Sequence, residues 1–509
     1  MGYLYLSAAH KSSGKTMITT GLARAFSDQG LKVQTFKKGP DYIDPKWLSH
    51  ASAQPCLNLD FNTQTHAEIT SLFTRHSAAS DISLIEGNKG LHDGVDLDGS
   101  NANSALAKLL QAPVVLIINT LGTTRGIAPL LLGYQSFDTN VDIAGVILNM
   151  VQGPRHESKL VQAVEEYTDI PILGTVRHNA NLNVDERHLG LIPHNEHPAA
   201  LARIESLADQ IRDQVDLKRL KSIADAAPTL APAPTLAPAP TLAPAPALAL
   251  APALVDPAPP LAPAPALDPV PPLDPVPALR VQTYKPDVRI AVAKDAAFGF
   301  YYEDDLEALR QAGAHIIYFN ALHDVYLPTC DALYIGGGFP ETQMAKLESN
   351  KTLRKRIKAA LEAGLPTYAE CGGLMYLTRS ITWHEDRHEM VGVIPADTIM
   401  NAKPQGRGYA RLTPTQHHPW PDMEASIPAH EFHYSSLENI DPKLIFAYDI
   451  QRGHGVDGTQ DGIIVHNVMA NFTHLRSTSR CQWAKAFTGF VRTLKKARGN
   501  APSPAQVAG

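Results

Sequence analysis

The first residues suited to chemistry form the segment Ser13-Gly14-Lys15-Thr16, which follows an apolar run at residues 3–8. A strand, a loop ending in Gly-Lys-Thr and an amphipathic helix pattern, in this order, are typical of a phosphate-binding loop. Backbone N–H groups of such a loop and the N-terminus of the following helix surround the phosphates of a nucleotide. We therefore expect ATP to bind here, with Lys15 contacting phosphate oxygens and the Thr16 hydroxyl binding Mg²⁺.

A nucleotide site of this kind also needs carboxylates for its metal ion. Glu86 ends an apolar run at residues 82–86, and carboxylates at the C-terminal ends of parallel strands face the ligand crevice of the sheet. The segment KKGPDYIDP at residues 37–45 adds two lysines and two aspartates, a density that indicates a site. The predicted Mg²⁺ ligands are Thr16, Asp41 and Glu86. We expect Lys38 to bind the nucleotide, and the predicted substrate-binding residues are Asp41, Tyr42 and Asp44.

A second centre is predicted at Cys371, which stands between the apolar run of residues 365–369 and two glycines. Glycines permit the sharp strand-to-helix turn that exposes a nucleophile, and a helix N-terminus favours the thiolate. Upstream, Gly337 and Gly338 can bring backbone N–H groups to a developing oxyanion. This pattern predicts a cysteine nucleophile for acyl transfer.

A thiolate in acyl transfer needs a base, and several histidines follow Cys371 in the chain. We select His474, because it comes directly after the apolar run of residues 463–472 and should stand at a strand end facing the crevice. The alternatives are His430, His433 and His466.

The elements that must position these residues alternate between apolar strands and helical patterns in both halves of the chain. The predicted strands lie at residues 3–8, 31–36, 82–87, 112–120 and 143–150, and again at 288–293, 315–319, 332–338 and 365–371. Continuous apolar strands separated by helices indicate parallel sheets covered on both faces. The predicted fold class is therefore α/β, with two doubly wound domains.

Proline marks the boundary between the two domains. Residues 226–279 consist of PTLAPA-like and LDPVP units and hold 18 of the chain's 40 prolines. Such a stretch favours extended polyproline segments and builds no packed core, so we predict a linker. The predicted division is a first domain at 1–225, an Ala/Pro-rich linker at 226–279, a second domain at 280–495 and a disordered tail at 496–509.

The composition excludes several function classes. With 45 Lys+Arg against 51 Asp+Glu the net charge is −6, so we expect no nucleic-acid partner. The 509 residues contain no apolar run of 18 residues and no secretion-signal pattern, so we expect no membrane association. The four cysteines lie far apart, which favours reduced thiols and a cytoplasmic location.

Taken together, these motifs resemble the glutamine-dependent amidoligases of tetrapyrrole biosynthesis, and most closely the cobyrinate (hydrogenobyrinate) a,c-diamide synthase family. The resemblance covers both halves, and its most specific segments are residues 37–45, 85–94, 132–149, 187–191, 333–341, 368–377 and 430–435. It implies an N-terminal P-loop domain like that of dethiobiotin synthetase and a C-terminal class I glutamine amidotransferase domain. Many triad-type domains carry a glutamate two residues after the histidine. Arg476 occupies that place here, which implies a Cys371–His474 dyad whose orienting group the sequence leaves open.

The resemblance implies a ligase that uses ATP, Mg²⁺ and glutamine to amidate the a and c carboxylates of cobyrinate or a related tetrapyrrole. Cys371 would release ammonia from glutamine, and the first domain would convert a substrate carboxylate into an acyl phosphate. The implied partners are small molecules, namely a tetrapyrrole polycarboxylate, glutamine and ATP, with a homodimer as one further expectation. The two crevices should face each other across a closed interface, because ammonia must be kept from protons.

Three alternatives stay open. The amino-acid sequences around Lys15 and Asp41 also resemble those of a subgroup that amidates sirohaem in sulfur-oxidising metabolism. A P-loop regulatory ATPase that binds a protein partner is a second alternative, although its usual lysine at the second loop position is His10 here. A glutaminase with a decayed synthetase domain is a third, and the intact Gly14, Lys15, Thr16 and Glu86 argue against it.

Overall fold

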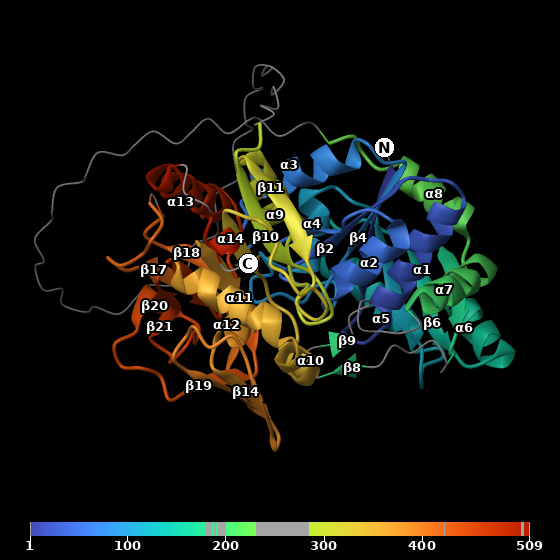
Figure 1. Ribbon diagram of the computed structural model, residues 1–509. Coiled ribbons are helices and arrows are strands. Elements are labelled where there is room, and N and C mark those ends of the chain that lie inside the picture. Colours follow the sequence, from blue (N-terminus) through green and yellow to red (C-terminus); the bar gives the residue numbers. More distant parts are fainter. Residues whose placement is uncertain are drawn as a thin grey trace, which may run out of the picture.

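The computed structural model describes residues 2–179, 186–187, 190–191, 200–230, 285–421, 423–499 and 503–507. The two predicted α/β domains are both present, and Figure 1 shows them side by side. Among these residues, no helix is long and apolar enough to cross a membrane.

The first domain is built on a parallel sheet of seven strands in the order β3-β2-β4-β1-β5-β6-β7. Its strands are β1 (Gly2–Ala8), β2 (Val33–Lys38), β3 (Leu57–Leu59), β4 (Ile82–Glu86), β5 (Val114–Asn119), β6 (Ile143–Val151) and β7 (Ile172–Arg177). Every residue of β1, β2 and β4 is buried, as expected for central strands covered on both faces.

Helices cover both faces of this sheet and make two separate cores. One core joins the sheet to α1 (Lys15–Asp28), α2 (Asp44–Ser52), α7 (Ala200–Gln214) and α8 (Leu217–Asp225). The other joins it to α3 (His66–Ser77), α4 (Asn103–Leu109), α5 (Ile127–Phe137) and α6 (Pro154–Tyr167). A short antiparallel pair, β8 (Glu186–Arg187) and β9 (Gly190–Leu191), precedes α7. The doubly wound arrangement predicted for the first half is confirmed.

The second domain has a nine-stranded sheet in the order β11-β10-β12-β13-β22-β21-β20-β17-β18. The parallel part contains the predicted strands β10 (Val288–Ala293), β11 (Ala314–Phe319), β12 (Ala332–Ile335) and β13 (Thr367–Glu370), together with β22 (Val468–Asn471). An antiparallel extension adds β17 (Gly406–Pro414), β18 (Ile427–His433), β20 (Ile445–Arg452) and β21 (Gln460–Val465). The sheet is therefore mixed. The strands predicted from the sequence form its parallel part, and the antiparallel strands extend it beyond β22.

The remaining elements of this domain pack around that sheet. A small four-stranded sheet contains β14 (Ser380–Trp383), β15 (Asp386–Glu389), β16 (Asp397–Met400) and β19 (Ser435–Glu438). The helices are α9 (Glu303–Gln311), the 3₁₀ turn η3 (Pro340–Gln343), α10 (Met344–Ser349), α11 (Lys351–Glu362), α12 (Gly372–Leu377), α13 (Trp483–Arg498) and α14 (Pro504–Val507).

The structure describes residues at two of the predicted boundaries, namely the start of the linker and the start of the tail. The linker lies outside the described residues from 231 onward, while its first residues pack on the first domain, where Tyr3 donates to the Pro228 carbonyl at 2.6 Å. The prediction of a disordered tail from 496 is wrong for residues 496–499 and 503–507. Helix α13 continues to Arg498, and Ala505 in α14 joins the core of the second domain. Apolar burial therefore orders this segment.

The domains meet along the C-terminal ends of β2 and β3. Tyr409 of the second domain donates to Asp60 Oδ1 at 2.9 Å, and Asn62 Nδ2 donates to the Ala429 carbonyl at 3.1 Å. Arg476 is fully buried and donates across the same boundary to the carbonyl of Asn58. These contacts place the C-terminal end of the edge strand β3 against the second domain.

Candidate active site

The phosphate-binding loop joins β1 to α1 and ends at Gly14, which has a φ of +83°. A side chain at this position would be strained, and its Cβ would lie 2.3 Å from Asn149 Nδ2. Asn149 in β6, which lies beyond β5 in the sheet, also donates to the Ser13 carbonyl at 2.9 Å and so holds the loop in place. Lys15 begins α1, and burial together with the nearby Lys37 ammonium lowers its pKa to about 8. The predicted loop is thus formed, and Asn149 is a partner that the motif did not reveal.

Beside the loop, side chains from three elements meet at Thr16. Thr16 Oγ1 donates to Glu86 Oε1 at 2.7 Å and to Asp44 Oδ2 at 3.2 Å. Lys37 Nζ donates to the same two oxygens, at 2.7 Å and 2.5 Å. The structure therefore brings Thr16 and Glu86 together as predicted, but the second carboxylate in this cluster is Asp44 rather than Asp41.

One lysine, Lys37, forms ion pairs with both carboxylates of this cluster. Burial would lower the pKa of Lys37, but the carboxylates of Asp44 and Glu86 raise it well above its ordinary value. Burial raises the pKa of Glu86, against the opposing effect of Lys37. Glu86 Oε2 is buried and has no hydrogen-bond partner among the described residues. A hydroxyl and two carboxylates with one unused oxygen fit the hard oxygen ligands that Mg²⁺ requires.

Asp41 and Lys38 take other positions than the sequence suggested. Asp41 Oδ1 accepts the N–H groups of Ile43 and Asp44, at 2.9 and 3.0 Å, at the start of α2. Burial and the neighbouring Asp44 carboxylate raise the pKa of Asp41 to about 7. Burial lowers the pKa of Lys38 to about 8, and its ammonium lies 6.0 Å from the centre of the Phe61 ring. The lysine that contacts Asp44 and Glu86 is Lys37, which the nucleotide-binding prediction did not include.

In the second domain, Cys371 forms the turn between β13 and α12, with φ 47° and ψ −102°. A positive φ in a residue with a side chain stores backbone strain, and such strain is concentrated at functional sites. This is the predicted elbow. Cβ atoms at the two adjacent glycines would collide with nearby atoms, at 2.9 Å from Pro340 and 2.1 Å from the Ile335 carbonyl. The small residues therefore follow from close packing around the turn.

His474 is the histidine that the structure places beside Cys371. The two side chains line the same cavity, and the backbone N–H of His474 donates to the His430 carbonyl at 2.7 Å. The two histidine rings stack at 4.9 Å, and the Tyr42 ring lies 5.1 Å from His474. His466 instead occupies the turn between β21 and β22.

The sequence did not reveal which residue lies beside Nδ1 of the His474 ring. Glu370, the residue before Cys371, has Oε2 at 3.4 Å from His474 Nδ1, and both side chains are buried. Burial lowers the pKa of His474, but the neighbouring Cys371 and Glu370 side chains outweigh this and raise the pKa to about 10. The signal in the sequence was the acid directly before the nucleophile.

The predicted oxyanion glycines also lie at this site. Gly338 lines the same cavity as Cys371, and a Cβ on Gly372 would lie 3.0 Å from the Gly338 nitrogen. A Cβ on Gly337 would lie 2.7 Å from His474 Cε1. Gly337 therefore leaves space for the imidazole, and Gly338 lies beside the nucleophile, while the oxyanion role of both glycines stays a prediction.

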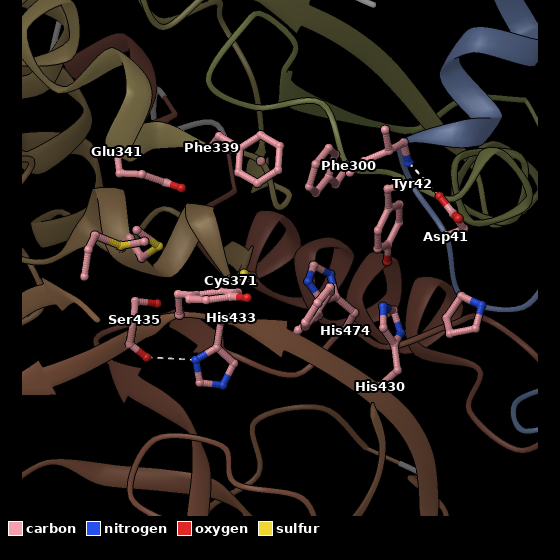
Figure 2. Close-up of a pocket in the computed structure, with 17 residues that line it drawn as sticks. Asp41, Tyr42, Phe300, Phe339, Glu341, Cys371, His430, His433, Ser435 and His474 are labelled. Atoms are coloured by element: carbon pink, nitrogen blue, oxygen red, sulfur yellow. Dashed lines mark hydrogen bonds between the residues drawn. The ribbon is translucent and has the colours of Figure 1, made fainter. Parts of the chain in front are cut away.

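A cavity of about 180 Å³ connects the two domains at this point. Its walls include Cys371 and His474 from the second domain and Asp41 and Tyr42 from the segment that follows β2. Figure 2 shows Tyr42 between Phe300 and the histidines, with Asp41 beyond it. The Tyr42 and Phe300 rings are stacked at 5.4 Å with an interplanar angle of 3°. One short segment of the first domain therefore carries residues to both centres.

Comparison with known proteins agrees with this two-centre arrangement. Residues 8–192 match the family model described as the CobQ/CobB/MinD/ParA nucleotide binding domain, and residues 289–481 match the CobB/CobQ-like glutamine amidotransferase domain. A cobyrinate a,c-diamide synthase of Magnetococcus marinus is 41% identical over 489 residues, covering 96% of this chain and 97% of that protein. The chain belongs to the cobyrinate a,c-diamide synthase family.

Further members of this family are similarly close over nearly their whole length. The Methanosarcina acetivorans cobyrinate a,c-diamide synthase is 35% identical and covers 93% of this chain and 92% of its own. The Listeria monocytogenes enzyme of the same name is 35% identical, with 93% and 96% covered. The predicted family, its ligase class and its pair of α/β domains are thereby confirmed, and the regulatory ATPase alternative is set aside.

Proposed function

We propose that this protein amidates the a and c carboxylates of cobyrinate, using ATP and ammonia released from glutamine. The observation that carries the proposal is the shared cavity, into which the Cys371 thiol and the Asp41–Tyr42 segment of the synthetase domain both project. The cavity brings the thiol close to the segment that carries Asp44 to the synthetase centre, as transfer of ammonia between the two centres requires.

At the glutaminase centre, Cys371 passes its proton to His474 and attacks the carboxamide carbon of glutamine. The backbone N–H of Gly338 is placed to stabilise the oxyanion. The imidazolium then gives its proton to the departing nitrogen, leaving a γ-glutamyl thioester that water cleaves to glutamate. The raised pKa of His474 keeps the imidazolium stable beside a thiolate, which favours the attacking state.

At the synthetase centre, the loop from Ser13 to Thr16 binds the phosphates, with Lys15 and Lys37 supplying positive charge. Thr16, Asp44 and Glu86 are the residues that would hold Mg²⁺, which neutralises charge on the transferring phosphoryl group when bound. A carboxylate is a poor acyl donor, so the substrate carboxylate is first converted into an acyl phosphate. Ammonia then displaces the phosphate and forms the amide.

Mutation of each centre tests this division of labour. Cys371→Ala should abolish glutamine use yet retain amidation with free ammonia, because the synthetase centre is intact. Lys15→Ala should lose amidation with either nitrogen source while still hydrolysing glutamine. Loss of ammonia-dependent amidation in Cys371→Ala, with an unchanged circular dichroism spectrum, would contradict the proposal.

The macrocycle is tested separately by offering purified cobyrinate and sirohaem with ATP and glutamine. Mass spectrometry should show a loss of about one mass unit per amidation on cobyrinate, since each step replaces a hydroxyl by an amino group on an acyl carbon. Amidation of sirohaem alone would assign the protein to the other subgroup. A cytoplasmic location and a homodimer remain predictions, and size-exclusion chromatography with light scattering tests the second.

A further inference from the structure

The carboxylate of Glu370 lies at the end of β13, directly before the nucleophile, and its Oε2 is 3.4 Å from His474 Nδ1. We propose that Glu370 is the positioning residue that orients His474, taking the role that triad-type amidotransferases give to an acid after the histidine. This inference rests on the proposed glutaminase function and deepens it.

Three donors fix the Glu370 carboxylate in place. Tyr368 Oη donates to Oε1 at 2.6 Å, and the Leu475 N–H donates to the same oxygen at 3.1 Å. Tyr334 Oη donates to Oε2 at 3.1 Å. Because Leu475 directly follows His474, its backbone hydrogen bond ties the carboxylate to the strand end that carries the imidazole. A carboxylate held in this way can select one ring orientation.

The strained elbow explains how neighbouring residues can both reach one imidazole. In a regular strand, Glu370 and Cys371 would point to opposite faces of the sheet. The positive φ of Cys371 breaks this alternation, so that the carboxylate approaches His474 Nδ1 while the Cys371 side chain lines the same cavity as the ring. The separation of 3.4 Å is longer than an ideal hydrogen bond, as is common before substrate binds.

Alternative orienting groups are lacking in the parts of the chain that the structure describes. No carboxylate there other than Glu370 lies within 4.0 Å of a His474 nitrogen. Arg476 occupies the position where triad-type domains carry their acid, and its guanidinium is turned to Asp304 Oδ2 at 2.8 Å and to the Asn58 carbonyl. The position after the histidine serves the domain boundary, and the position before the cysteine supplies the acid.

The test compares Glu370→Gln with wild type in steady-state glutamine hydrolysis and in ammonia-dependent amidation. We expect kcat for glutamine hydrolysis to fall by about 100-fold or more, since loss of an orienting carboxylate elsewhere costs up to about 10⁴-fold. The KM for glutamine should change little, and ammonia-dependent amidation should be retained. Glu370→Asp should recover part of the lost kcat. Glu348→Gln is the matched control, because it removes a carboxylate that pairs with another histidine of the same domain, His388 at 2.8 Å, and does not line the Cys371 cavity.

A readout specific to positioning is the pH dependence of Cys371 alkylation by iodoacetamide. Without the carboxylate the imidazolium is less stable, so the alkylation profile of Glu370→Gln should move to higher pH, while that of Glu348→Gln should not. All four cysteines are buried, so Cys371→Ala gives the background from the other three.

Full kcat and an unshifted alkylation profile in Glu370→Gln would overturn the inference and leave the glutaminase function standing. Loss of ammonia-dependent amidation in Cys371→Ala would instead defeat the function itself. Should Glu370→Gln fail to fold, Glu370→Asp decides the question, because an unchanged kcat and alkylation profile in that variant contradicts a positional role.

Discussion

We predict that Arg476 stabilises the interface between the two domains. Its removal should therefore allow ammonia to escape to solvent before it reaches the synthetase centre. Its buried guanidinium lies 2.8 Å from Asp304 Oδ2 and 4.7 Å from the centre of the Tyr302 ring, and donates across the boundary to the Asn58 carbonyl. Asn58 Nδ2 in turn donates to the carbonyls of Gly39 and Asp41, each at 2.8 Å. Arg476 thus reaches, through one residue, the segment that lines the shared cavity.

The expected cost follows from burial. Breaking a buried ion pair by removing one partner costs about 3–5 kcal/mol, because the other charge stays buried and unpaired. For a domain of this size, each kcal/mol lowers the unfolding midpoint by about 2–4 °C. Arg476→Met should therefore lower the transition of the second domain by roughly 6–20 °C. Adding Asp304→Asn should restore part of this loss, because no unpaired charge remains.

Coupling between the centres is measured as glutamate released per amide formed. We expect near-equal amounts in wild type and an excess of glutamate in Arg476→Met. The matched control is Arg354→Met, which removes a buried arginine that donates to the Met390 and Glu348 carbonyls within the second domain. The control should lose stability but stay coupled. Unchanged coupling and an unchanged unfolding midpoint in Arg476→Met would refute the reasoning.

Three further predictions concern charge and metal. Lys37→Met should destabilise the first domain by about 3–5 kcal/mol, because Glu86 and Asp44 lose their buried partner; Lys108→Met, which removes an exposed pair, should cost at most about 1 kcal/mol in the same urea titration. The raised pKa of His474 adds stability that is complete below its ordinary value of 6.5 and is lost as pH rises through about 10, so thermal midpoints of wild type should fall over this window more than those of Glu370→Gln. Chelation of divalent cations should abolish amidation with either nitrogen source but leave glutamine hydrolysis intact, and hydrolysis that stops with the chelator would contradict two separate centres.

Local patterns were sufficient to identify both chemical centres. The Gly-Lys-Thr loop, the acid at the end of β4 and the cysteine between a strand and two glycines each combine residues that are close along the chain. Steric and hydrogen-bonding requirements act over those few residues, so they leave a readable sequence signal. His474 also follows an apolar run, but only the family resemblance distinguished it from the other histidines.

Contacts between distant segments could not be read in this way. Whether Asp41 or Asp44 faces Thr16 depends on where α2 begins, and the Asp41 side chain is taken up by capping that start. The tail beyond residue 496 was predicted to be disordered, although a few apolar residues are enough to order it once a core is available.

The amino-acid sequence alone determined the family, the two α/β domains and the pair of reacting groups, because these depend on local spacing and on apolar periodicity. Only the tertiary structure placed Glu370 beside His474, Arg476 at the domain boundary and Lys37 between two buried carboxylates. Such roles arise when strands far apart in the chain bring charges together in a low-dielectric interior, where each buried charge needs a partner.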